Sequence, residues 1–215
     1  MPNKNIKYFH MQLKILNESQ VQPGDILLCY SADLKGKNEC VMQGYSHVAI
    51  CTFKTGVIEA SSNGINRTSV IDLLSEYGHI AVLRNSKLWS RKRLERLDEF
   101  VAKKIGLKFN QTGMYRVPER KEEQDAEIMT RVKGYFEGRF VPKSHDRDIY
   151  FCSELVTAAF IDVGIIDESA SIILSPETFS PEDIGRDKAF GFFVGYIKSY
   201  DDYPIPDDDD FRTAL

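Results

Sequence analysis

The sequence predicts a single α+β domain in which an antiparallel sheet comes first and the main helices follow. Short apolar segments separated by turn residues fill positions 21–85, as in a meander of strands. Apolar residues at positions 94, 97, 101 and 105 then recur with helical spacing. The 215 residues are 42% hydrophobic and 28% charged, with no internal repeat and no visible domain boundary, which favours one globular domain.

Each expected strand is a short apolar run next to a turn signal such as Pro23-Gly24 or Asn63-Gly64. The turn Lys54-Thr55-Gly56 is short enough to join its two flanking runs as a hairpin. The expected strands are 26–30, 46–53, 57–60, 66–71 and 79–83, followed much later by 189–197.

Two helices have clear ends in the sequence. The first covers 89–105 and stops at Gly106, and the second covers 152–162 and stops at Gly164, because glycine is favoured just beyond a helix. The remaining segments are expected to be a loop at 107–118, a charged short helix or insert at 119–136, and a helix start at 175–178.

Both ends of the chain differ from its body. Residues 1–20 are polar and weakly patterned, which predicts a short helix or an arm over the main domain of residues 21–200. Residues 201–215 contain six Asp and one Arg, which favours a disordered acidic tail. The whole chain carries a net charge of −4, so the part before the tail is near neutral.

Several classes of protein are disfavoured by these properties. A near-neutral body lacks the clustered basic face of a nucleic-acid-binding protein. No run of eighteen apolar residues is present, so no integral membrane segment is expected. The first residues have no apolar core of a signal peptide, and four cysteines are too few for a disulfide framework. We therefore expect a cytoplasmic protein with free thiols.

Cys152 stands where the second helix should begin. Apolar residues at 155, 156, 159 and 160 follow it at helical spacing, so Cys152 shares the inward face. A thiol in the first turn of a helix is close to the positive end of the helix dipole, which favours the thiolate. The position suits a nucleophile, and it also suits a buried cysteine without a chemical role.

A nucleophilic cysteine needs a base, and His47 is the best placed of the four histidines. His47 opens the strand 48–51, so alternation along the strand puts it on one face with Ala49 and Cys51. The alternative is a histidine that makes only a structural hydrogen bond at the strand end.

Glu59 interrupts the apolar strand 57–60, and strands seldom bury a carboxylate without a partner. The hairpin brings Glu59 next to the strand of His47, where a carboxylate can fix the orientation of the imidazole. The alternative is that Glu59 faces water.

Four segments together resemble the circularly permuted papain-like hydrolases of the NlpC superfamily, and most closely the YiiX/YebB-like branch. They are Gly24–Leu27, Ser46–Ile50, Val57–Ala60 and Tyr150–Val156. The resemblance covers roughly residues 21–198, with about 110–145 as a variable insert. It implies an antiparallel sheet or small barrel packed against helices, with the nucleophile at a helix N-terminus. In this family the histidine-bearing strands precede the cysteine helix, the reverse of the order in papain.

Carried over residue by residue, the resemblance makes Cys152 the nucleophile, His47 the general base and acid, and Glu59 the group that orients His47. A family stretch that usually reads Gly-x-x-Tyr-Asp is similar to Gly106–Asn110, with Phe109 and Asn110 in place of the tyrosine and aspartate. The candidates for the oxyanion hole or substrate pocket are Tyr45, Ser46, Phe109, Tyr150 and Ser153.

The chemistry that the resemblance implies is cleavage of an amide bond, of a peptide or an N-acyl amino acid type, through a thioester on Cys152. No cofactor is expected, and the partner is a small peptide-like or acylated substrate. A lipid acyltransferase or phospholipase of the same superfamily is one alternative, and a binding module without turnover is another.

A metal site is not expected. Cys29, Cys40, His47 and Cys51 lack the closely spaced pair that is typical of zinc ligands, and Cys29 and Cys51 are expected to face the sheet core.

Overall fold

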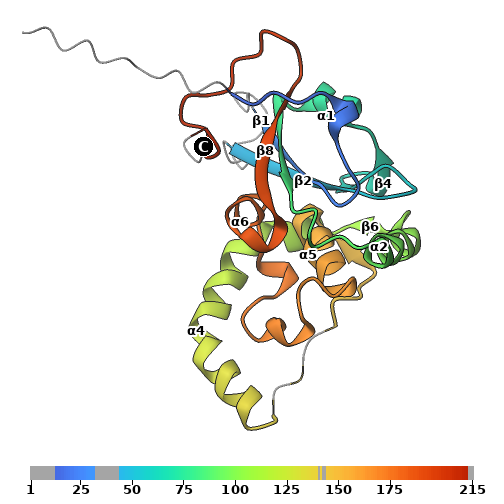
Figure 1. The fold of residues 1–215 in the computed structure, drawn as a ribbon. Coiled ribbons are helices and arrows are strands. Elements are labelled where there is room, and N and C mark those ends of the chain that lie inside the picture. Colours follow the sequence, from blue (N-terminus) through green and yellow to red (C-terminus); the bar gives the residue numbers. More distant parts are fainter. Residues whose placement is uncertain (1–12, 32–43, 140, 142–143, 213–215) are drawn as a thin grey trace, which may run out of the picture.

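A computed structural model describes residues 13–31, 44–139, 141 and 144–212. Within these residues the chain forms a six-stranded antiparallel sheet, in the order β4-β3-β2-β1-β5-β8, and a small two-stranded parallel sheet (Figure 1). The strands are β1 Ile26–Ser31, β2 Gly44–Cys51, β3 Val57–Ser61, β4 Gly64–Thr68, β5 His79–Arg84, β6 Lys108–Phe109, β7 Ile149–Tyr150 and β8 Phe192–Lys198. The α+β class predicted from the sequence is confirmed.

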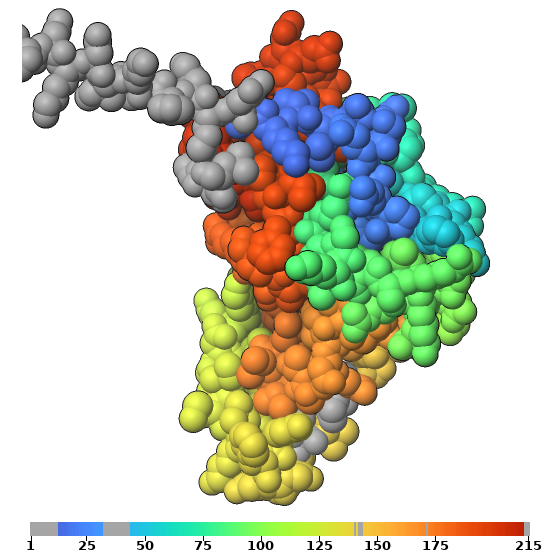
Figure 2. All heavy atoms as spheres, in the orientation of Figure 1, coloured from blue at the N-terminus to red at the C-terminus, as the bar shows by residue number. Residues whose placement is uncertain are grey.

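Apart from α1, the helices lie in the chain between β5 and β8. They are α1 Val70–Glu76, α2 Arg91–Lys104, α3 Gln111–Tyr115, α4 Val117–Phe136, α5 Cys152–Asp162 and α6 Pro181–Arg186, with short 3-10 turns η1 Glu18–Gln20, η2 Glu168–Ile172, η3 Pro176–Thr178 and η4 Lys188–Phe190. Helix α4, α5 and the segment with η2 and η3 form the lower part of the molecule, whereas β8 and the residues after it lie in the upper part with the sheet (Figure 1, Figure 2). In the part of the chain described here, no helix is long and apolar enough to cross a membrane.

Alternation along the central strands gives the sheet two buried faces. On β1, Ile26 and Leu28 pack into the cluster that contains α5, whereas Leu27 and Cys29 pack into the opposite cluster with Leu73 of α1. Both faces are therefore covered, which explains why β1 is apolar at nearly every position.

Strand β2 is only partly paired on its β3 side. Its register with β3 runs from Ala49 to Cys51, while its pairing with β1 continues back to Gly44. Cys29 pairs with His47 and Tyr30 pairs with Tyr45, so Ser46 is an extra residue in β2, and the alternation of side chains between the two faces changes there. The first half of β2, including His47, thus has one edge that β3 does not cover.

Helix α5 lies against this part of the sheet and is buried over its first ten residues, from Cys152 to Ile161. It contacts β2 and β3 on one side and α2 on the other. As predicted, it begins at Cys152 and ends before Gly164, which has a φ of 70° that favours glycine. The burial of a whole helix, rather than one stripe, explains why its sequence is apolar on nearly every side.

Several expected elements differ in the structure. The expected strand at 66–71 ends at Thr68, because Ser69 caps α1 by accepting a hydrogen bond from the Asp72 N–H. The expected loop at 107–118 contains β6, α3 and the start of α4, and the insert at about 110–145 includes the 20-residue α4. The expected helix at 175–178 is the 3-10 turn η3, and the last strand starts only at Phe192.

The prediction of a disordered acidic tail is wrong over residues 201–212. Tyr203, Ile205 and Phe211 are buried in the main core, and Asp209 is 3% exposed. The Asp209 carboxylate accepts hydrogen bonds from the hydroxyls of Tyr45 (2.9 Å) and Tyr196 (2.6 Å). A count of charges alone predicts disorder here, but the apolar residues between the aspartates pack into the core and hold the segment in place. Residues 213–215 lie outside the described part.

The start of the described chain also packs on the sheet. Leu16 donates its N–H to the Tyr196 carbonyl, and Tyr196 donates its N–H to the Lys14 carbonyl, so this segment runs along the edge of β8. The part of the expected N-terminal arm before residue 13 lies outside the described residues.

Asp209→Ala should lower the free energy of unfolding by about 2–4 kcal/mol, because buried hydroxyls of Tyr45 and Tyr196 and the ring of His79 would lose their acceptor. Burial raises the pKa of Asp209, but the hydrogen bonds from His79 and Tyr196 outweigh it and lower the pKa. The contribution should therefore be lost as pH falls below the usual carboxyl range. Urea unfolding measures it, and the exposed Asp210→Ala is the control; equal losses in both variants would contradict the prediction.

Candidate active site

His47 and Glu59 form a hydrogen-bonded pair on adjacent strands. The Nε2 atom of His47 lies 2.8 Å from Oε2 of Glu59, with His47 6% exposed. Glu59 is opposite Ala49 in the β2–β3 register, so it is the diagonal neighbour of His47 on the same face. The hairpin expected from the turn at 54–56 thus brings the two side chains together.

Cys152 lies at the first position of α5, against the uncovered edge of β2. Its thiol interacts with the His47 ring and with the backbone N–H groups of Val48 and Ser153. Because Nε2 of His47 is bonded to Glu59, Nδ1 is the ring nitrogen left for the sulfur. Three residues that are far apart in the sequence, in the order His47, Glu59, Cys152, therefore meet in one place.

The electrostatics of this pair favour thiolate and imidazolium. Burial raises the pKa of the Cys152 thiol, but the hydrogen bond and charge of His47 and the two backbone N–H groups outweigh it, so the pKa lies below its usual value. Burial lowers the pKa of His47, but Cys152 and Glu59 together raise it to about 10. Both changes favour the thiolate–imidazolium pair over the neutral thiol and imidazole.

Tyr77 is a neighbour of His47 that the sequence did not reveal. Its ring stacks on the imidazole, with the ring centroids 5.5 Å apart and the planes within 4° of parallel. Tyr77 directly follows α1, whose first two residues were expected to end a strand. The stacking limits rotation of His47, whose ring is also held by Glu59.

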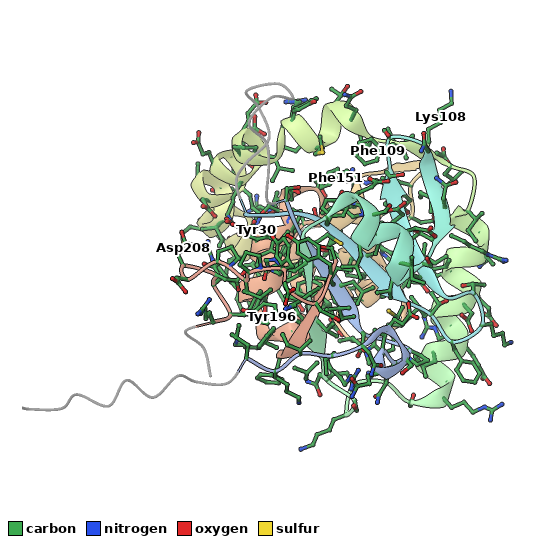
Figure 3. All side chains as sticks on the ribbon, turned by 90° about the horizontal axis from the view of Figure 1, so that it is seen from above. Tyr30, Lys108, Phe109, Phe151, Tyr196 and Asp208 are labelled. Atoms are coloured by element: carbon green, nitrogen blue, oxygen red, sulfur yellow. The ribbon has the colours of Figure 1, made fainter. Side chains whose placement is uncertain are left out.

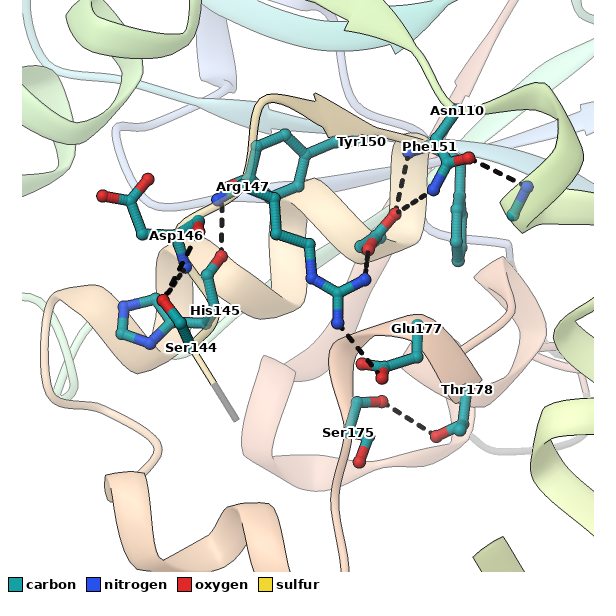
Figure 4. A network of polar contacts seen from close by, with 12 residues as sticks. Asn110, Ser144, His145, Asp146, Arg147, Tyr150, Phe151, Ser175, Glu177 and Thr178 are labelled. Carbon is teal, nitrogen blue, oxygen red and sulfur yellow. Dashed lines mark hydrogen bonds and ion pairs between the residues drawn. The ribbon is translucent and has the colours of Figure 1, made fainter. Parts of the chain in front are cut away.

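A buried polar network supports the start of α5. Glu154 is fully buried; it accepts a hydrogen bond from the Phe151 N–H (3.3 Å), and it pairs with Arg147 (2.9 Å) (Figure 4). Arg147 in turn pairs with Glu177 of η3 at 3.1 Å. Through these bonds the first turn of α5, which carries Cys152, is fixed both to the loop before it and to η3.

Asn110 completes this network. Its amide nitrogen lies 3.2 Å from Oε2 of Glu154, and its carbonyl oxygen accepts a hydrogen bond from the Gly113 N–H at 2.9 Å. An aspartate at this position would place a second carboxylate against buried Glu154. An asparagine at position 110 is therefore compatible with buried Glu154, and its amide helps to hold the start of α5.

The hydroxyls of the residues before His47 are engaged elsewhere. Tyr45 bonds to Asp209 and lies 3.2 Å from Nε2 of His79, while Ser46 and Ser31 join their hydroxyls at 2.7 Å. Tyr45 thus ties the beginning of β2 to residues 201–212. Both were expected in the substrate pocket, and in this structure both make structural bonds.

The other expected pocket residues surround the base of α5. Ser153 donates its hydroxyl to the Phe179 carbonyl (2.7 Å), and Tyr150 donates to the His145 carbonyl (2.9 Å). Phe109 pairs with Tyr150 in the β6–β7 sheet. Figure 3 shows Phe151 in the crowded interior and Lys108, next to Phe109, at the outer edge. The hydroxyls of Ser153 and Tyr150 are therefore both bonded to backbone carbonyls near the start of α5.

The remaining histidines and cysteines have other environments. His79 is fully buried beside Asp209, and Nε2 of His145 lies 3.7 Å from Asp162. Cys29 and Cys51 are buried free thiols in the cluster that contains α1. Burial raises the pKa of both thiols, the opposite of the change at Cys152.

Among the described residues no group of three or more His, Cys, Asp or Glu side chains could hold a metal ion. Cys40 and His10 lie outside these residues.

Comparisons with known proteins provide no relative. A scan of protein-family models finds no match to this chain, and searches of curated proteins and of solved structures find none either. The site is therefore interpreted from its own residues and geometry.

Proposed function

We propose that this chain is a cysteine hydrolase of the permuted papain-like type that cleaves an amide bond through a thioester on Cys152. The observation that carries the proposal is the convergence of Cys152 and Glu59 on the His47 ring, whose Nε2 faces Glu59. A nucleophile, a base and an orienting carboxylate in this arrangement are the parts that covalent acyl transfer requires. The chain order, with His47 and Glu59 before Cys152, supports the permuted type.

In the first step, the Cys152 thiolate attacks the carbonyl carbon of the substrate. The C–N bond then breaks, and the leaving amine takes the proton from Nδ1 of His47, which produces a thioester on Cys152. In the second step, His47 takes a proton from water as the water attacks the thioester. The acid product leaves, and the thiolate and imidazolium are restored. Glu59 accepts the hydrogen bond from Nε2 of His47 throughout and so keeps the ring in one orientation.

The site chemistry favours acyl transfer and leaves the acyl group to be identified. We expect hydrolysis of an N-acyl amino acid or short peptide, and we expect phospholipid to be left intact. The test offers N-acyl amino acids, short peptides and phospholipid vesicles to the wild type and to Cys152→Ala. Turnover of phospholipid alone would replace the amidase assignment with that of a lipid enzyme.

The thioester itself should be observable. An activated acyl ester incubated with the wild type and rapidly quenched in acid should add one acyl mass to the protein, on the peptide that contains Cys152. Cys152→Ala should show no adduct, and Glu59→Gln should slow acylation by roughly tenfold to a hundredfold, because the imidazolium loses its carboxylate. Acyl adducts spread equally over Cys29, Cys51 and Cys152 would contradict the mechanism.

A further inference from the structure

Helix α4 is bonded to the rest of the molecule by polar side chains, among them Lys121, Gln124 and Arg131. Of its twenty residues, only Val117 is buried. It runs alongside the segment that contains η2 and η3, down one edge of the molecule (Figure 1). Arg120, Gln124 and Arg131 recur at helical spacing on the side that faces this segment. A helix that packs on a protein usually presents an apolar stripe, so the polar stripe requires an explanation.

A cavity of about 290 Å³ separates α4 from η3. Its lining is almost entirely polar and consists of Arg116, Arg120, Glu123, Gln124, Glu127, Arg131, Ser175, Glu177 and Thr178. The volume is that of a small ligand with several polar groups.

Arginine side chains in the cavity lining supply positively charged hydrogen-bond donors. The Nη1 atom of Arg120 is buried and has no hydrogen-bond partner among the described residues. Arg131 reaches across the cavity, because its guanidinium donates to Gln124 (3.1 Å) and to the Ser175 hydroxyl (3.2 Å). A buried guanidinium nitrogen without an acceptor is costly, and a carboxylate is the group that matches its geometry.

Three glutamates line the same cavity and supply negative charge. Glu123 and Glu127 are exposed on α4, one and two turns from Arg120, while Glu177 is already paired with Arg147. A dianion would be repelled by the two exposed glutamates, and a simple cation would be repelled by the arginines. A ligand with one carboxylate and one ammonium group complements both sets.

We propose that the cavity between α4 and η3 binds a free α-amino acid or similar small zwitterion, with its carboxylate on Arg120 and its ammonium group toward Glu123 and Glu127. The site is distinct from Cys152 and does not depend on the proposed catalysis. It is nevertheless connected to it, because Glu177 lines the cavity and bonds Arg147, which bonds Glu154 on α5.

The test is ligand-detected NMR titration of the full chain with matched probes. L-Alanine should bind, and N-acetylalanine and alaninamide, which each lack one charge, should bind at least tenfold more weakly. Inorganic phosphate should bind more weakly than alanine as well. Stronger binding of phosphate or N-acetylalanine than of alanine would overturn the zwitterion assignment, and so would the absence of any alanine binding.

Arg120→Met should weaken alanine binding at least tenfold, because it removes the proposed carboxylate partner. Arg139→Met is the matched control, since that side chain is 71% exposed and lies outside the cavity lining. Glu127→Gln is a second variant on the exposed side of α4, and it should weaken alanine while leaving N-acetylalanine unchanged. Unchanged alanine binding in both cavity variants would overturn the proposal.

Discussion

His47→Ala is expected to slow alkylation of Cys152 at pH 6 by roughly a hundredfold to a thousandfold, because the reacting species is the thiolate. In the wild type, the His47 imidazolium and the N–H groups of Val48 and Ser153 lower the pKa of Cys152 against the effect of burial. Without the imidazolium, burial dominates and the thiol stays protonated. Timed labelling with iodoacetamide, followed by peptide mass analysis, measures the rate at each cysteine.

The same experiment contains its own controls. Cys29 and Cys51 are buried thiols whose pKa is raised, so they should label slowly in the wild type and in the variant alike. Equal labelling of Cys29, Cys51 and Cys152 in the wild type would remove the basis for a nucleophile.

The pH dependence of labelling follows from the same pair. The thiolate and imidazolium coexist between the lowered pKa of Cys152 and the raised pKa of His47, which lies at about 10. The wild-type rate should therefore depend less on pH than that of a free thiol, and it should fall as pH drops through the lowered pKa of Cys152. In His47→Ala the rate should instead rise steeply with pH, about tenfold per unit below the pKa of the free thiol.

Arg147→Ala is expected to lower the free energy of unfolding by about 2–4 kcal/mol at pH 7, because it leaves Glu154 buried without its cation. Glu154 has no exposed surface, and Asn110 and the Phe151 N–H would be its remaining partners. Urea unfolding at fixed pH measures the loss.

The sign of the pH dependence identifies the cause. Burial raises the pKa of Glu154, and Arg147 opposes this change. Since a raised carboxyl pKa makes the folded state bind the proton more tightly, the variant should lose stability as pH rises through that range. Arg147→Ala should therefore recover part of its loss at pH 5. Arg139→Ala, which removes the exposed pair with Glu137, should cost less than about 1 kcal/mol at either pH. A pH-independent loss in Arg147→Ala would point to packing instead.

Residues 201–212 show where local sequence reasoning fails. Their aspartates predict disorder when counted as exposed charges, and Asp209 is instead buried against Tyr45 and Tyr196. Those partners come from β2 and β8, so no window of neighbouring residues contains them. Helix α1 was missed for a related reason, since its seven residues follow a strand with only Ser69 as a signal.

The sequence by itself determined the α+β class, the hairpin that carries His47 and Glu59, and the position of Cys152 at the start of a helix. These depend on alternation, turn residues and helix ends, which act over a few neighbouring residues. Only the tertiary structure decided that Cys152 meets the edge of β2 that β3 leaves uncovered, that Tyr77 stacks on His47, and that Arg147 and Asn110 support Glu154. The contact of Cys152 with β2 joins segments more than a hundred residues apart, and packing of the whole core is what brings them together.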